Sequence, residues 1–182
     1  MNVVTWLELD VTLRGAKPAP WRRIQVPVAA TFHDLHVAIQ DACGWEDDHL
    51  FRFTDRDGRV LAGLGEDIDG TREPDPATTS LSSHFRRHRV CLYLYDFGDW
   101  WEHDVRLVRT LDLDRLSGRQ LVDGALAFPP EDCGGVWGYA DSIRVARDGG
   151  DGSEEDAERR EWLGDWDPDA FDLAATKATF DA

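Results

Sequence analysis

The segment TFHDLHVAIQDACG, residues 31–44, predicts one amphipathic helix with a signal at each end. From Phe32 onward, apolar side chains recur at the three- and four-residue spacing of a helix that is buried on one side. Thr31, followed three residues later by Asp34, matches a weaker variant of the capping box that begins helices. Gly44 stands where glycine commonly ends them.

Strand patterns flank this helix on both sides. In residues 3–13, apolar side chains occupy most odd positions, which is the period of a half-buried strand. Alternation resumes over residues 24–28. After the helix, the apolar pair Phe51 and Phe53 and the residues Val60 and Leu61 are separated by a turn signal, which predicts a hairpin. The resulting order, β-β-α-β-β, resembles the start of a β-grasp fold.

A second hairpin is expected further along the chain. Residues 90–95 are apolar on both faces, residues 96–99 favour a turn, and residues 101–107 alternate again. We expect this hairpin to lie centrally in a mixed or antiparallel sheet. Residues 63–83 lack periodicity and predict an exposed loop excursion, and residues 141–182 predict acidic helices. The fold class is therefore α+β.

Length and charge narrow the class of protein further. The chain has 182 residues, with 20 Lys and Arg against 36 Asp and Glu, which gives a formal net charge of −16. We expect one domain over residues 1–182, long enough to form a core without disulfides or metals. Because the net charge repels phosphate backbones, direct binding of nucleic acid is not expected.

Targeting and cysteine patterns point to a reducing compartment. No apolar run approaches the roughly 18 residues of a membrane span, and the first residues lead into a strand pattern instead of a signal peptide. The three cysteines are odd in number and widely spaced, which disfavours a disulfide framework or a paired-cysteine zinc site. We therefore predict a cytoplasmic protein. The sequence identifies no cofactor and assigns no metal ligand.

Four segments, in a fixed order, carry a recognisable pattern: PWRRI at 20–24, DLH through GW and HL within 34–50, YDFGDWWEH at 95–103, and PPEDCGG at 129–135. Together with the ending from Trp162 to Leu173, they resemble the plasmid pRiA4b ORF-3-like family over nearly the whole chain. The resemblance implies a compact α+β domain, found mainly in prokaryotes and sometimes carried on plasmids or mobile elements. It implies no catalytic residue. Relatives often have a second histidine where this chain has Phe51.

The YDFGDWWEH segment supplies the first group of candidate binding residues: Asp96, Asp99, Trp100, Trp101, Glu102 and His103. Carboxylates with imidazole can bind a divalent metal or pair an acid with a base. Strand alternation, however, places Glu102 and His103 on opposite faces. Asp96 and Asp99 are also typical of a tight turn, and the register of His103 is also that of a core imidazole.

The second group combines PPEDCGG with a histidine from an earlier motif: Glu131, Asp132, Cys133 and His49. Backbone N–H groups at the diglycine can form an anion nest, and the Cys133 thiol can act as a nucleophile or a soft metal ligand. A structural turn is the alternative.

Eight tryptophans form the remaining signal. Most are expected in the core, because each brings a large apolar area with a single N–H group. Trp100 and Trp101 should face opposite sides of their strand. An exposed tryptophan beside carboxylates suits a peptide or a cationic ligand.

These observations support three hypotheses on function. The first is a non-enzymatic interaction module for a protein or peptide partner, linked to plasmid or mobile-element biology. The second is a metal-assisted hydrolase that uses carboxylates with His103 or His49, and with Asp132 or Cys133 from the other motif. The third is a DNA-associated accessory protein of transposition, which the acidic C-terminal part disfavours. Whether the protein is an enzyme is left open.

Overall fold

The computed structural model describes residues 3–66, 70–113 and 118–180. Its strands form one seven-stranded sheet in the order β4-β3-β5-β6-β1-β2-β7, and every neighbouring pair is antiparallel. The strands are β1 (Val4–Leu13), β2 (Trp21–Pro27), β3 (Phe51–Thr54), β4 (Val60–Gly63), β5 (Val90–Tyr95), β6 (Trp101–Leu113) and β7 (Gln120–Ala125). The predicted α+β class and the β-β-α-β-β start are confirmed.

The second hairpin lies in the middle of the sheet, as expected. β5 and β6 are the third and fourth strands, and β6 pairs with β1 along most of its length. β7 was not predicted from the sequence. Only Leu121 of its side chains is buried, so it lacks the alternation that reveals a strand.

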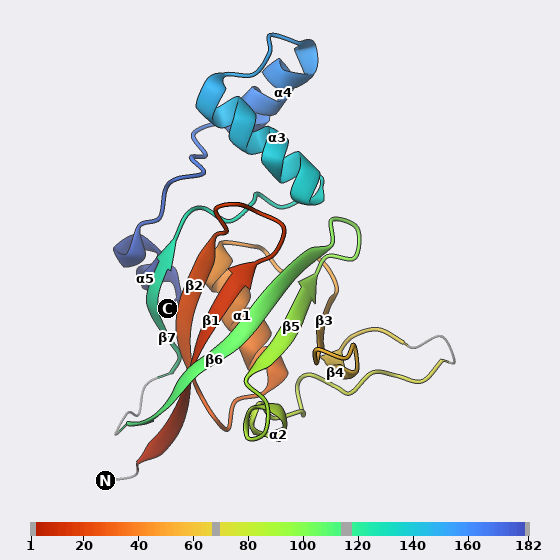
Figure 1. The fold of residues 1–182 in the computed structure, drawn as a ribbon, viewed down its shortest axis with the longest axis vertical. Coiled ribbons are helices and arrows are strands. Elements are labelled where there is room, and N and C mark those ends of the chain that lie inside the picture. Colours follow the sequence, from red (N-terminus) through yellow and green to blue (C-terminus); the bar gives the residue numbers. More distant parts are fainter. Residues whose placement is uncertain (1–2, 67–69, 114–117, 181–182) are drawn as a thin grey trace.

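The helix α1 (Phe32–Cys43) is confirmed together with both of its end signals. The Thr31 side chain accepts a hydrogen bond from the Asp34 backbone N–H at 3.1 Å, and the Asp34 carboxylate accepts one from the Thr31 N–H at 2.8 Å. Gly44 adopts a left-handed conformation with φ of 80°. The helix lies across one face of the sheet (Figure 1).

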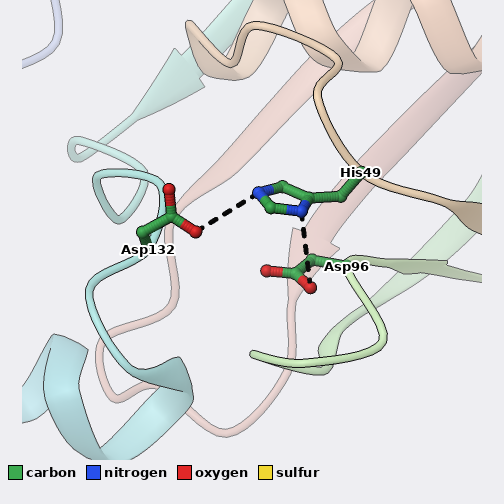
Figure 2. Close-up of side chains that lie close together, drawn as sticks. All are labelled: His49, Asp96 and Asp132. Carbon is green, nitrogen blue, oxygen red and sulfur yellow. Dashed lines mark ion pairs between the residues drawn. The ribbon is translucent and has the colours of Figure 1, made fainter.

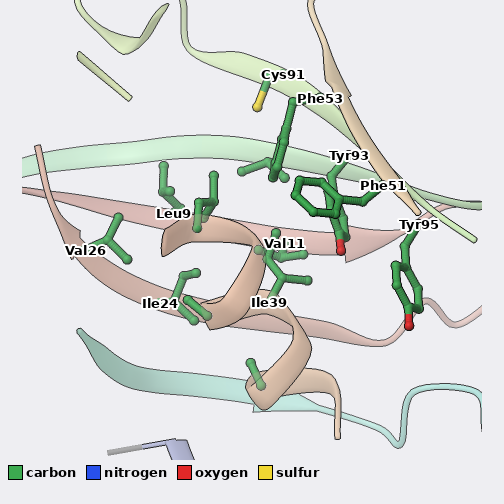
Figure 3. Packing of buried hydrophobic residues seen from close by; sticks show 14 of the residues in the cluster. Leu9, Val11, Ile24, Val26, Ile39, Phe51, Phe53, Cys91, Tyr93 and Tyr95 are labelled. Atoms are coloured by element: carbon green, nitrogen blue, oxygen red, sulfur yellow. The ribbon is translucent and has the colours of Figure 1, made fainter. Parts of the chain in front are cut away.

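The core fills the space between α1 and this face. Figure 3 shows the inward side chains of four strands converging on Ile39 of α1: Leu9, Val11, Ile24, Val26, Phe51, Phe53 and Tyr93. Alternate residues of each strand point the same way, so the predicted period of two explains why these side chains share one face. Trp101 and His103, on β6, belong to the same buried side. The opposite face is not fully exposed, because Trp6, Glu8 and Gln25 are buried there.

Four further helices are α2 (Ser82–Phe85), α3 (Gly135–Asp148), α4 (Glu154–Leu163) and α5 (Leu173–Phe180). Figure 1 places α3 and α4 beyond one end of the sheet, where the β5–β6 turn also lies, and α5 beside β7. The helical C-terminal part therefore begins at Gly135, earlier than the predicted residue 141. Among the described residues, no helix has the length and apolarity needed to cross a membrane.

Many described side chains of the 63–83 segment are exposed, but the segment is also anchored to the rest of the protein. The Glu73 carboxylate is buried and forms an ion pair with Arg52 of β3. Leu81 is fully buried in the core, and Ser80 forms a bridge with Thr31. The segment lacks periodicity because it is held at isolated points. Residues 67–69 lie outside the described part of the chain.

Arg22, from the PWRRI motif, joins the sheet to the segment that leads into PPEDCGG. The buried guanidinium donates to the backbone oxygens of Ala42, Ala125 and Leu126 at 2.8, 3.1 and 2.9 Å. It also lies 4.8 Å from the ring centre of Phe128. A planar group with five N–H donors suits this cluster of carbonyls. Arg22 therefore fixes where the segment after β7 leaves the sheet.

Candidate functional site

Three segments that are far apart in sequence meet at the end of the sheet near α3. Figure 2 shows His49, from the α1–β3 loop, between Asp96 at the end of β5 and Asp132 in the segment before α3. Its Nδ1 lies 3.8 Å from an oxygen of Asp96, and its Nε2 lies 3.3 Å from an oxygen of Asp132. One ligand atom from each of the three residues lies within 4.8 Å of the others. These atoms can hold a metal ion.

Burial varies across this cluster. The Asp96 side chain is 10% exposed, that of His49 29%, and that of Asp132 75%. Asp96 adopts a left-handed conformation, and its Oδ1 accepts a hydrogen bond from the Gly98 N–H at 2.8 Å. The predicted turn contact of Asp96 is therefore present. The same carboxylate also faces His49, so the turn and the cluster share it.

Glu131 connects the three segments. The Tyr95 hydroxyl donates to Oε1 of Glu131 at 2.5 Å, and the backbone N–H of Glu46 donates to Oε2 at 2.8 Å. Tyr95 directly precedes Asp96, and Glu46 lies in the loop that carries His49. Burial and the bond to Glu131 raise the pKa of Tyr95 well above its usual value, so its hydroxyl stays protonated and donates. Sequence reasoning missed Tyr95, although it begins the YDFGD motif, and no local signal marks Glu46.

Asp99 makes a second connection between the motifs. Its Oδ2 accepts a hydrogen bond from the Gly134 N–H at 3.1 Å. A Cβ at Gly135 would lie only 2.6 Å from the Asp99 carbonyl oxygen, so this position requires glycine. The diglycine therefore serves close packing against the β5–β6 turn. The Gly134 N–H is already occupied by Asp99, which argues against the predicted anion nest at this group.

Cys133 does not fit the predicted nucleophile. It is buried, and burial raises the pKa of its thiol to about 12. The thiol is consequently protonated at neutral pH, whereas both nucleophilic attack and metal binding need the thiolate. The expectation failed because the sequence does not show that α4 covers this loop.

Three other candidates lie apart from the cluster. Trp101 and His103 are buried, and burial lowers the pKa of His103 to about 4, so it is the core imidazole considered as the alternative. Glu102 points to the opposite face, as strand alternation predicts, where its carboxylate lies 3.7 Å from Arg14. Trp101 and His103 are therefore inaccessible to a ligand, and Glu102 faces away from them.

Several exposed apolar side chains come from these loops and from α3 and α4. Trp100 is 54% exposed, Trp137 86% and Trp162 51%, and Leu50, next to His49, is half exposed. Trp100 follows Asp99, and Trp137 lies in the first turn of α3. Trp162 borders a groove of about 280 Å³ whose other lining residues are Asp132, Cys133, Glu155, Glu158 and Arg159. Only Trp100 was singled out from the sequence. The helical spacing of Glu155, Glu158 and Trp162 was the available signal for the groove.

Comparisons with known proteins identify relatives in sequence and in fold. The family model described as plasmid pRiA4b ORF-3-like protein matches residues 5–175. An uncharacterized protein, y4hQ, of Sinorhizobium fredii is 36% identical over 170 residues, which cover 92% of this chain and 86% of the relative. A crystal structure of a protein of unknown function, MM3350 from Methanosarcina mazei Go1, has a TM-score of 0.80 and 36% identity, with 96% of this chain and 98% of the other covered. The chain belongs to the plasmid pRiA4b ORF-3-like protein family.

Proposed function

We propose that this protein is an interaction module that binds a basic segment of a protein or peptide partner at the groove beside α4. The observation that carries the proposal is the pairing of a half-exposed tryptophan, Trp162, with carboxylates in one concave surface. An aromatic face next to negative charge attracts an ammonium or guanidinium group and also packs against its apolar stem.

The charges that line the groove favour a cation. Glu155 and Glu158 make no ion pair with the described residues. Arg159 is the one basic residue of the lining, and its Nη1 donates to the backbone oxygens of Cys133 and Gly138 at 3.4 and 3.3 Å. This guanidinium is directed toward the main chain, so the two glutamates are available to a partner. Such an arrangement favours positively charged partners over negatively charged ones.

Peptide binding by fluorescence polarisation tests this proposal. Three labelled peptides of equal length are compared, one rich in lysine, one neutral and one rich in glutamate. We expect the lysine-rich peptide to bind most tightly, and Trp162→Ala to weaken it about fivefold, as expected for loss of about 1 kcal/mol of cation–π interaction. Leu64→Ala is the matched control, because Leu64 is 54% exposed and does not line this groove.

A pair of charge-matched variants distinguishes binding in the groove from general attraction to an acidic protein. Glu155→Gln with Glu158→Gln removes two charges from the groove, whereas Glu154→Gln with Glu161→Gln removes two from elsewhere on α4. The proposal requires the first pair to weaken binding clearly more than the second. Equal effects of the two pairs, or equal affinity for the lysine-rich and neutral peptides, would contradict it.

A further inference from the structure

We propose that His49, Asp96 and Asp132 form a binding site for one divalent transition-metal ion of the Zn²⁺ type. This site shares Asp132 with the groove beside α4, but it does not depend on peptide capture. Three features of the structure support it: a buried carboxylate without a cation, a donor set suited to such an ion, and a scaffold that holds the three segments together.

The buried carboxylate is that of Asp96. Its side chain is nine-tenths buried, yet among the described residues no lysine or arginine lies within ion-pair distance of it. The base that faces it in the described part of the chain is His49, at 3.8 Å, which is beyond hydrogen-bond distance. A buried carboxylate is costly unless a positive charge compensates it. A metal ion between Asp96 and His49 supplies that charge.

The donor set combines one imidazole nitrogen with two carboxylate oxygens. Imidazole favours zinc and its neighbours over magnesium and calcium, which prefer oxygen ligands. Ligand atoms at the corners of a tetrahedron around such an ion lie about 3.4 Å apart, given bond lengths near 2.1 Å. The present 4.8 Å spread closes by side-chain rotation, because His49 and Asp132 are both accessible to solvent. Three protein ligands leave a further coordination position open.

The scaffold is the pair of bonds made by Glu131. Both of its carboxylate oxygens are used, one by Tyr95 and one by Glu46, so Glu131 positions the three segments without being a ligand itself. Supporting hydrogen bonds of this kind orient the ligands in known metal sites. The Asp96 carboxylate also accepts a hydrogen bond within its turn, as described above. Asp132, in contrast, accepts no hydrogen bond from the backbone of the described residues. Among the described residues, the side chain within ion-pair distance of Asp132 is His49, at 3.3 Å.

The test is isothermal titration calorimetry of ZnCl₂ into the full-length protein after chelator treatment. We expect one ion per chain in the wild type. His49→Ala, Asp96→Asn and Asp132→Asn should each weaken binding at least tenfold. Asp132 is the safest position for folding, because its side chain is 75% exposed, and circular dichroism verifies that each variant is folded.

The matched control is His88→Ala. His84 and His88 stack with ring centres 4.8 Å apart and form a histidine pair that can also attract zinc. We expect this variant to bind like the wild type. If Zn²⁺ does not bind, or if binding survives in both His49→Ala and Asp132→Asn, the proposal is wrong. Loss of binding only in His88→Ala would place the ion at His84 and His88 and would overturn it equally.

Discussion

Two tyrosines on the same face of β5 belong to two different regions of this molecule, the core and the loops at one end of the sheet. Tyr93 and Tyr95 lie two residues apart with nearly parallel rings, 6.4 Å between centres. The Tyr93 hydroxyl ends inside the core, 2.7 Å from His36 and 2.9 Å from Gln40 of α1. The Tyr95 hydroxyl reaches Glu131 at the loops. Figure 3 shows both side chains pointing the same way from the strand.

The two regions are stabilised in different ways. Around Tyr93, apolar side chains from several strands pack against α1, so many small contacts share the stabilisation. At Tyr95, single hydrogen bonds of Glu131 and Asp99 hold three loops in place. A substitution in the first region should therefore change the stability of the whole protein. A substitution in the second should change the geometry of the loops at a smaller cost in stability.

The largest effect is expected in the core. Phe53→Ala removes a fully buried ring that packs against Phe32, with 5.0 Å between ring centres, and against Tyr93. The free energy of unfolding should fall by about 3–5 kcal/mol, measured by urea denaturation. Leu64→Ala, at an exposed position, should change it by less than about 0.5 kcal/mol. A loss below about 1 kcal/mol for Phe53→Ala would contradict the assignment of this face as the main core.

Arg22 lies where the two regions meet, and substitutions there test how much its hydrogen bonds contribute to stability. Arg22→Met keeps much of the side-chain volume but leaves the backbone oxygens of Ala42, Ala125 and Leu126 without their donor. We expect the free energy of unfolding to fall by about 3 kcal/mol. Each buried acceptor without a partner costs about 1–3 kcal/mol, and partial relaxation of the backbone around them reduces the total. Arg22→Lys should recover some of this loss. Thermal and urea unfolding measure both variants, and a neutral Arg22→Met would show that these bonds are dispensable.

The buried His103 makes stability depend on pH. Burial lowers its pKa to about 4 in the folded protein, against about 6.5 in the unfolded chain, so between these values the unfolded chain binds more protons. Its contribution to stability is therefore complete above about pH 6.5 and is lost as the pH falls toward 4. From pH 7 to pH 5 the expected loss is about 2 kcal/mol. In His103→Gln, urea denaturation at several pH values should show a flatter profile. An unchanged profile would assign the effect to other groups.

The smallest expected change in stability comes from the loop end. Tyr95→Phe removes the hydroxyl that donates to Glu131 and should cost about 1 kcal/mol. Because this bond holds the segment of Asp132 next to Asp96, the affinity for Zn²⁺ should fall several-fold. Tyr93→Phe is the matched control, with the same atom removed inside the core, and its zinc affinity should equal that of the wild type. If both variants bind zinc equally well, the Glu131 bonds do not position the site.

Much of the core was predictable from local patterns. The strand in residues 3–13 and the capping box at Thr31 were each predicted from neighbours in sequence, and the structure confirms both. The strand is not half-buried, however, because Trp6 and Glu8 on its other face are buried too. Strand alternation also placed Glu102 and His103 on opposite faces. β7 was missed because its single buried residue, Leu121, sets no period.

The arrangement of the candidate site was beyond local reasoning. His49 and Asp132 are far apart in sequence. They face each other because the α1–β3 loop and the segment after β7 lie at the same end of the sheet. The motif residues themselves were identified, but the sequence does not show which of them meet. The burial of Cys133 and His103 likewise became evident only once the positions of α4 and β6 were known.

The most direct test of the loop-end metal site is anomalous diffraction at the zinc absorption edge, from a crystal of the full-length protein soaked in ZnCl₂. We predict a strong peak about 2.0–2.2 Å from one ring nitrogen of His49 and from carboxylate oxygens of Asp96 and Asp132. A map without a peak between these side chains, or with its strong peak at His84 and His88, would contradict it.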